Sequence, residues 1–221
     1  MLKLENISKS FVQRGVVLDK LNLEAGEGDS IAITGPSGSG KTTLMNIIGA
    51  LDRPDSGDIS FRGDSILTLD SDELAGYRNR NIGFVFQDHL LLNHLTIKEN
   101  ILLPVFAERI SEKDYNEKEE YALSLMSRIG ITSIMDKYPF QVSGGEAQRA
   151  TLVRALIGKP SIILADEPTG SLDSKNAELL GRLLTDMNKD FGITLIVATH
   201  SHHLASLMGL HLRLEDGKLK S

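Results

Sequence analysis

Apolar and polar residues alternate in two stretches near the start of the chain. The alternation runs through residues 2–7 and again through residues 17–23, which is typical of strands with one buried face. A turn at residues 53–57, rich in Pro, Asp, Ser and Gly, precedes a further strand-like stretch at 58–63. These patterns predict a small antiparallel β subdomain.

Unbroken apolar runs farther along the chain predict strands that are buried on both faces. Such strands are typical of parallel sheets covered by helices. Segments with helical spacing, residues 43–48 and 176–189, lie between such runs. A hairpin around an Asp-Gly turn at residues 212–219 ends the pattern. The alternation of strands and helices predicts an α/β core. The predicted buried strands are residues 30–34, 82–86, 162–165 and 194–198.

The middle of the chain has few β-branched runs and many helix formers. Charged clusters within residues 111–120 precede an apolar-periodic stretch at 121–126, as expected for helices with one exposed face. We predict a helical subdomain here within a single domain. The predicted division is one domain over residues 1–221, with the core and β subdomain at 1–87 and 151–221 and the helical subdomain at 88–150.

Composition and charge limit the function classes. The chain has 221 residues, of which 41% are hydrophobic, and no cysteine, so disulfides and thiolate metal sites are excluded. The apolar runs are far shorter than the roughly 20 residues needed to cross a bilayer. A net charge of -6 argues against nucleic acid as a partner. With no apolar signal segment at the start, we expect a cytoplasmic protein whose membrane contact is through a protein partner.

A phosphate-binding motif lies between the predicted strand at 30–34 and the helix that follows. Residues 35–42 fit the pattern G-x-x-x-x-G-K-[ST], in which backbone N–H groups surround phosphate oxygens. Lys41 is expected to bridge the β and γ phosphates of ATP, and Thr42 to offer its hydroxyl to Mg²⁺. A flexible Gly/Ser turn is the alternative, which the flanking strand and helix disfavour. The predicted binding residues are Gly35, Pro36, Ser37, Gly38, Ser39, Gly40, Lys41, Thr42 and Thr43.

Two adjacent carboxylates follow the predicted strand at 162–165. Ligands of parallel sheets bind at the carboxyl ends of the strands, so Asp166 and Glu167 are expected at the same edge as the phosphate loop. Neighbouring residues of a strand point to opposite sides, so we assign Asp166 to Mg²⁺ and Glu167 to an attacking water, as general base. A plain helix cap or turn is the alternative.

A second glycine motif, residues 142–149, opens a helix and forms an anion site with no phosphate of its own. The order of the phosphate loop, this segment, the carboxylate pair and His200 resembles that of the ATP-binding cassette (ABC) ATPases over essentially the whole chain. The resemblance implies a P-loop NTPase (RecA-like) core and a head-to-tail homodimer around ATP. The signature residues that would contact the ATP held by Lys41 of the other copy are Ser143, Gly144, Gly145 and Glu146.

The resemblance implies further roles. Phe11 stands where an aromatic ring stacks on adenine, although it could equally be a core residue. Gln87 is similar to the glutamine that touches Mg²⁺ and the attacking water, and His200 to the histidine that hydrogen-bonds the γ-phosphate. Asp173 resembles the residue that joins the two active sites, with loop capping as the alternative.

Within the family, the chain resembles the lipoprotein-release, macrolide-export and cell-division ATPases. This implies the ATP-hydrolysing subunit of a transporter on the cytoplasmic face of the inner membrane, driving a separate permease. Leucines within residues 90–95 would contact that permease or pack internally. A soluble ATPase switch acting on nucleic acid or ribosomes is the alternative. Departures from the family pattern are Val142, Ala147 and Ser171, of which the first two put the turnover rate in question.

Overall fold

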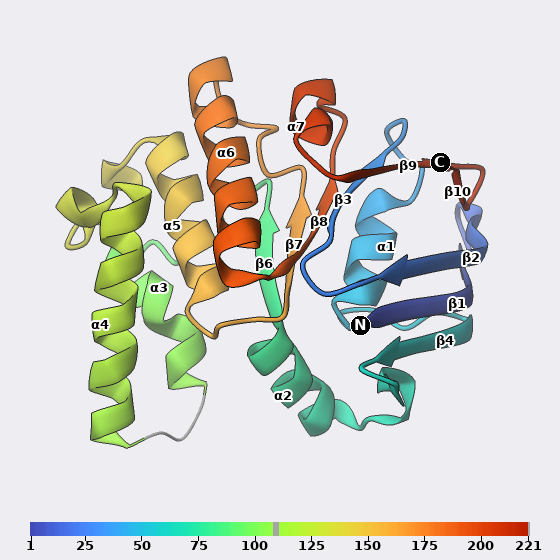
Figure 1. Ribbon diagram of the computed structural model, residues 1–221, viewed down its shortest axis with the longest axis horizontal. Helices are drawn as coiled ribbons and strands as arrows, with labels where there is room; N and C mark the ends of the chain where they lie inside the picture. The colour runs from blue at the N-terminus through green and yellow to red at the C-terminus, as the bar shows by residue number, and fades with distance from the viewer. Residues whose placement is uncertain (108–110, 221) are drawn as a thin grey trace.

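Two β-sheets and a set of helices form the computed structural model, which describes residues 1–107 and 111–220 (Figure 1). In that part of the chain the larger sheet has the strand order β10-β9-β3-β8-β7-β6. Strands β6, β7, β8, β3 and β9 run parallel, and β10 pairs antiparallel with β9. Its strands are β3 (Ser30–Thr34), β6 (Ile82–Phe86), β7 (Ile162–Asp166), β8 (Thr194–Ala198), β9 (Leu210–Glu215) and β10 (Lys218–Lys220).

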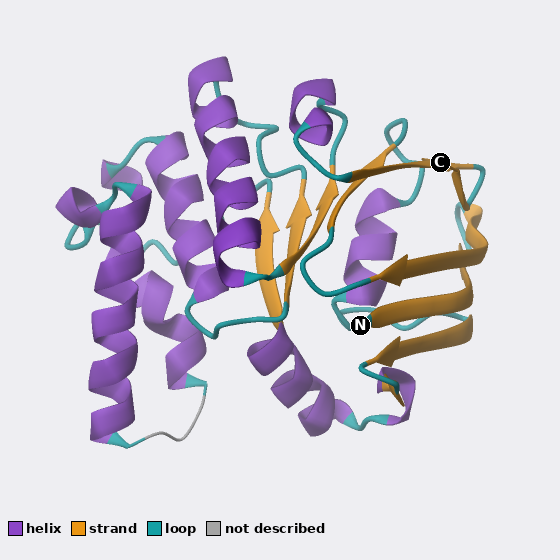
Figure 2. Cartoon of the chain, in the orientation of Figure 1, coloured by secondary structure: helices purple, strands orange, loops and turns teal. Residues whose placement is uncertain are grey.

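The smaller sheet is antiparallel, with the order β2-β1-β4-β5. Side chains of β1 alternate as the sequence predicts, with Leu2, Leu4 and Ile7 buried. These residues share a core with helix α1 (Lys41–Ile48), which lies between the two sheets (Figure 2). The strands of this sheet are β1 (Leu2–Phe11), β2 (Gly15–Ala25), β4 (Ser56–Phe61) and β5 (Asp64–Ser65).

Most of the helices lie on the side of the larger sheet opposite α1, either against the sheet or against one another. Along β3, Ile31 and Ile33 pack in the core that holds α1, whereas Ala32 packs in the core that holds α5 and α6. Helices α1 and α5 therefore lie on opposite faces, because successive side chains of a strand alternate. The remaining helices are α2 (Ser71–Asn81), α3 (Ile97–Phe106), α4 (Glu112–Ile129), α5 (Gly144–Leu156), α6 (Ser174–Phe191) and α7 (His202–Ser206).

The predicted α/β architecture is confirmed, including the antiparallel sheet. The limit predicted for the helical subdomain at residue 150 falls inside α5, which continues to Leu156. Helix α5 begins at Gly144, directly after the signature serine, and its C-terminal turn packs against β6, where Ala155 lies beside Gly83. Over residues 1–107 and 111–220, no helix has the length and apolar character needed to span a bilayer.

Candidate nucleotide-binding site

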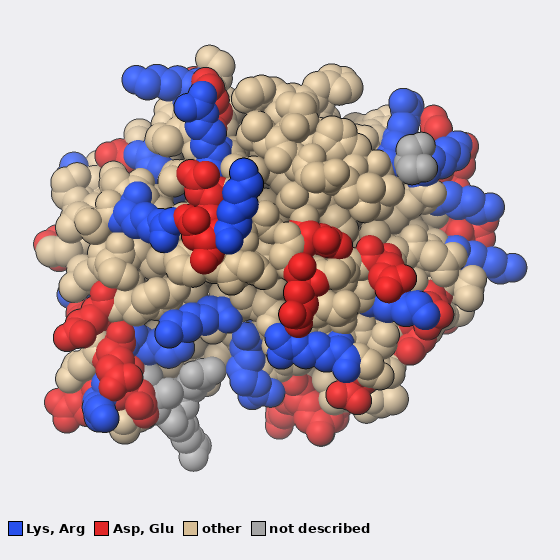
Figure 3. All heavy atoms as spheres, in the orientation of Figure 1, with Lys and Arg blue, Asp and Glu red and all other residues tan. Residues whose placement is uncertain are grey.

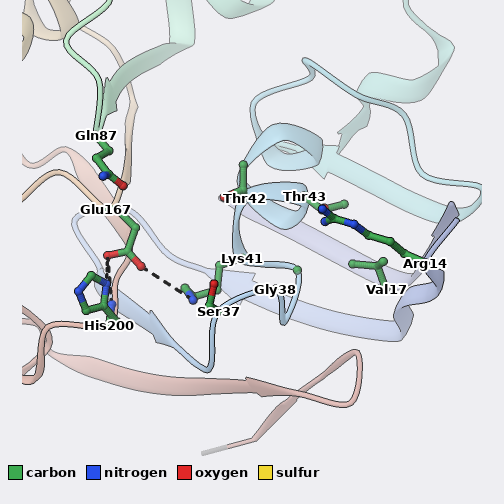
Figure 4. Close-up of a pocket in the computed structure, with 11 residues that line it drawn as sticks. Arg14, Val17, Ser37, Gly38, Lys41, Thr42, Thr43, Gln87, Glu167 and His200 are labelled. Atoms are coloured by element: carbon green, nitrogen blue, oxygen red, sulfur yellow. Dashed lines mark hydrogen bonds and ion pairs between the residues drawn. The ribbon is translucent and has the colours of Figure 1, made fainter. Parts of the chain in front are cut away.

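A cavity of about 630 Å³ opens beside the phosphate loop (Figure 4). Its walls come from segments far apart in the sequence: the β1–β2 hairpin, the loop with the first turn of α1, and the ends of β6, β7 and β8. This convergence at the carboxyl ends of parallel strands is the place where such sheets bind ligands. The residues that line it are Arg14, Val17, Ser37, Gly38, Gly40, Lys41, Thr42, Thr43, Gln87, Glu167 and His200.

The loop depends on glycine at the point where it enters α1. Gly40 is the N-cap of that helix and has a φ of 103°, a backbone conformation that residues other than glycine rarely adopt. A Cβ here would lie 2.7 Å from Val17 Cγ1 in the neighbouring hairpin. The first turn of α1 lines the cavity, so its free N–H groups and partial positive charge are available to a phosphate.

Lys41 is almost fully buried beneath the loop. Its ammonium donates hydrogen bonds to the carbonyl oxygens of Gly35, at 2.9 Å, and Pro36, at 3.2 Å. The nearest carboxylate oxygen of Glu167 lies 3.9 Å from Lys41 Nζ. Two carbonyl groups of the loop therefore hold the Lys41 ammonium in the wall of the cavity.

Glu167 faces Lys41 across the cavity, and its other oxygen is held by the end of β8 (Figure 4). Oε2 lies 2.8 Å from His200 Nδ1, accepts a bond from the His200 N–H at 3.2 Å, and accepts one from Thr199 Oγ1 at 3.3 Å. Three donors thus fix one oxygen and leave Oε1 directed into the cavity.

The strand alternation predicted for the carboxylate pair does not extend to Glu167. Strand β7 ends at Asp166, and Glu167 has a φ of 46°, outside the extended region. Its N–H still donates to Ala198 O of β8 at 2.8 Å, so the chain leaves the strand conformation directly beside β8. As a result both carboxylates line one smaller hollow, together with Thr42 and Gln87.

The surroundings of Asp166 fit a divalent cation. The residue is only 9% exposed, and its Oδ1 is buried with no hydrogen-bond partner among the residues described. Burial raises the pKa of Asp166 above its ordinary value, an effect that a hydrogen bond from Thr42 opposes and the Glu167 charge reinforces. A buried, unsatisfied carboxylate oxygen beside a hydroxyl is an oxygen donor set of the kind that Mg²⁺ prefers.

The hairpin tip adds two residues that the sequence analysis did not assign. Arg14 and Val17 both line the main cavity, and Arg14 also borders a shallow hollow with Phe11 and Thr43. Phe11 is 39% exposed, so the core interpretation of this ring is wrong. Lys9 Nζ lies 5.5 Å from its ring centroid. The available signal for Arg14 was a cation three residues after an aromatic residue in a strand-to-strand turn.

The signature residues are absent from this cavity. Ser143 is exposed at the start of α5. The N–H and the hydroxyl of Ser143 donate to Glu146 Oε2, at 2.8 Å and 2.7 Å. The Glu146 N–H donates back to Ser143 Oγ at 3.3 Å, which completes a capping box. These bonds from the Ser143 N–H and hydroxyl lower the pKa of Glu146. One chain therefore brings the phosphate loop, Gln87, Glu167 and His200 together, but not the signature.

Asp173 has the capping role that was its alternative. It is the N-cap of α6 and accepts bonds from the backbone N–H of Asn176, at 3.0 Å, and from its Nδ2, at 2.6 Å. The bond from the Asn176 N–H is the main cause that lowers the pKa of Asp173. Asn176 Oδ1 in turn lies where a Cβ on Gly145 would come within 2.4 Å. The start of α6 thus packs directly against the signature.

The fold and this cavity define an ATP-binding cassette, and the chain belongs to the ABC transporter family, whose model matches residues 18–170. It is 42% identical to the lipoprotein-releasing system ATP-binding protein LolD of Bacteroides thetaiotaomicron, covering 100% of this chain and 99% of that protein. It is 43% identical to LolD 1 of Rhodopirellula baltica, with 99% and 96% covered, and 43% identical to the ABC transporter ATP-binding protein YxdL of Bacillus subtilis, with 99% and 85% covered.

Solved structures agree with this assignment. The dimeric structure of MJ0796, a bacterial ABC transporter cassette, superimposes with a TM-score of 0.89 at 38% identity, covering 100% of this chain and 97% of that one. A dimeric post-hydrolysis state of MJ0796 bound to ADP and Pi gives 0.87 at 37% identity, with the same coverage. The predicted family, P-loop NTPase fold and ATPase activity are confirmed.

Proposed function

We propose that this chain is the ATP-hydrolysing subunit of a transporter that works on lipoproteins or a similar membrane-held cargo. The observation that carries the proposal is the division of the site: Lys41, Glu167 and His200 converge in one cavity, while Ser143 lies at the start of a helix on the other face of the sheet. Relatives over the full length are named for lipoprotein release.

A head-to-tail dimer completes such a divided site. If two copies face each other, Ser143 and Gly145 of one chain reach the γ-phosphate held by Lys41 of its partner. Each ATP then lies between two chains, so nucleotide favours the closed dimer and hydrolysis removes that preference. In this proposal Asp173, beside the signature, links one site to the other.

Within each site the residues divide the work. We assign Glu167 as the base that takes a proton from the attacking water, since Oε2 is fixed by His200 and Thr199 while Oε1 faces Lys41 in the cavity. Gln87 orients the water, and His200 and Lys41 hold the γ-phosphate. Asp166, Thr42 and Gln87 would hold Mg²⁺, which supplies charge neutralisation on the phosphates. Arg14 and Phe11 would bind the nucleoside end.

We assign the partner surface to the region beyond Gln87. Leu90 and Leu92 are exposed, at 60% and 42%, whereas Leu91 packs against the core. A groove of about 350 Å³ between α2, β6, α3 and α5 carries Arg78 and Arg154. An apolar edge beside two cations fits an amphipathic, acid-bearing cytoplasmic segment of a permease. On the face seen in Figure 3 basic and acidic side chains occur together, and the net charge of -6 disfavours nucleic acid as the partner.

Co-purification tests the proposal. A tagged chain expressed in its own cell should be recovered from the inner-membrane fraction together with a permease that carries a large extracytoplasmic domain. The same sample should hydrolyse ATP only with Mg²⁺ present. Recovery with ribosomes or DNA, and none with membranes, would instead support a soluble ATPase switch.

A further inference from the structure

Gln148 is a fully buried side chain in the second turn of α5, with no exposed surface. Its Nε2 donates to Phe86 O at 2.6 Å and to Pro168 O at 2.9 Å. Its Oε1 lies 3.1 Å from His89 Nδ1. All three partners belong to other segments of the chain, so the amide of Gln148 connects α5 to those segments.

The two carbonyl groups that accept from Gln148 lie next to residues of the proposed catalytic site. Phe86 immediately precedes Gln87, and Pro168 immediately follows Glu167, so one amide is bonded next to both. Burying an amide costs free energy unless its hydrogen bonds are made, and an apolar residue would pack here without that condition. The geometry therefore ties the loop that carries Gln87 to the loop that carries Glu167.

Helix α5 holds the first of these loops at a second point. Arg154 donates to His89 O and Leu90 O, each at 2.9 Å, and burial lowers the pKa of its guanidinium. The segment from Phe86 to Leu90 is thus fastened along two turns of the helix. A shift of α5 along its axis would move this segment with it, because packed elements shift as units.

We propose that Gln148 is a positioning residue that couples the two ATP sites of a dimer. The signature lies at the start of α5 and would meet the nucleotide held by the partner. Gln148 transmits the resulting displacement of α5 to Gln87 and Glu167 of its own chain. Each site then becomes competent when the other is filled. This inference rests on the proposed dimer.

The test compares Gln148→Leu with Thr151→Val. Thr151 is also buried on the same helix, but among the described residues its hydroxyl donates within the helix, to Gln148 O at 2.8 Å. For Gln148→Leu we expect kcat to fall by about 10–100-fold, as for a small misplacement of catalytic groups, with KM within roughly threefold. The Hill coefficient for ATP should fall towards 1. Thr151→Val should keep the wild-type kcat and Hill coefficient.

A milder variant keeps the test decisive if Gln148→Leu does not fold. His89→Ala removes the partner of Oε1 alone, so kcat and the Hill coefficient should change in the same direction but less. A wild type that hydrolyses ATP without cooperativity would overturn the proposed coupling, and so would Gln148→Leu and His89→Ala variants that both behave like Thr151→Val. A wild type without Mg²⁺-dependent hydrolysis would instead contradict the proposed function.

Discussion

The phosphate-loop cavity and the signature end of α5 both contain the N-terminus of a helix, but they are built in opposite ways. In the cavity, Lys41 and Asp166 are buried, and one Asp166 oxygen has no hydrogen-bond partner in the described part of the chain. At the signature, Ser143 and Glu146 satisfy each other on an exposed surface. The first site is therefore ready for nucleotide, whereas the second must exchange existing bonds for new ones.

This difference would account for the dependence of the proposed dimer on ATP. A phosphate approaching Ser143 replaces Glu146 as the acceptor of its hydroxyl, so the net gain is small unless the phosphate is already fixed. In the proposed dimer, the cavity of the other chain would supply that fixed phosphate. The comparison predicts large effects on chemistry from the cavity residues, and effects on association from the signature.

The largest expected effect is that of Glu167→Gln. The amide cannot take the proton of the attacking water, so turnover should fall by about 10²–10⁴-fold, whereas the size of the side chain is kept. ATP binding should persist, and dimers should accumulate, as measured by ATPase assay and by light scattering with Mg²⁺ and ATP. Glu120→Gln, at an exposed carboxylate of α4, is the control and should match the wild type. Normal turnover in the Glu167→Gln variant would refute the base assignment.

Ser143→Ala should weaken association next most strongly. In the Glu167→Gln background we expect the ATP-dependent dimer to dissociate about 10–100-fold more readily, since a hydrogen bond to a charged group is worth about 1.5–3 kcal/mol. Thr96→Ala is a matched control, because Thr96 and Glu99 form the same capping box at α3. Both variants lose about 1 kcal/mol of helix capping. Equal dimer affinity in the two variants would contradict the role of the signature.

The parts of the site that the sequence predicted are those determined by short segments. Lys41 and Thr42 follow from one local motif, and Asp166 follows from an apolar strand and the residue after it. Fully buried strands such as β7 and β8 also stand out, because both faces are covered and every residue is apolar or nearly so.

The sequence could not predict contacts between distant segments. Gln148 reaches Phe86, 62 positions away, and its amide resembles any other polar residue of a helix until the fold is known. The conformation of Glu167 depends likewise on Ala198 of the neighbouring strand. The absence of Ser143 from the cavity also follows from the helix lying on the other face of the sheet, which no local pattern specifies.

Substitution of one glycine in each region should change the stability of the folded chain to a different extent. Gly40→Ala places a Cβ at a φ of 103° and 2.7 Å from Val17 Cγ1, so we expect a cost of about 1–3 kcal/mol and a melting temperature lower by roughly 2–10 °C. Gly144→Ala meets only Leu172 Cδ2, at 4.0 Å, and should leave the melting temperature unchanged or slightly raised. Calorimetry of the two nucleotide-free variants checks this, and equal destabilisation would contradict it.

The smallest expected effect is a pH dependence at the signature cap. Hydrogen bonds from the Ser143 N–H and hydroxyl lower the pKa of Glu146 below its ordinary value of 4.5, so the folded state binds the proton less tightly than the unfolded one. The cap therefore contributes stability above pH 4.5 and loses it as pH falls through the lowered pKa. Glu146→Gln should melt about 1–3 °C below the wild type at pH 7, a difference that shrinks in acid. A gap that stays constant from pH 7 to pH 3, as expected of Glu120→Gln, would show that the Glu146 carboxylate does not hold this helix end.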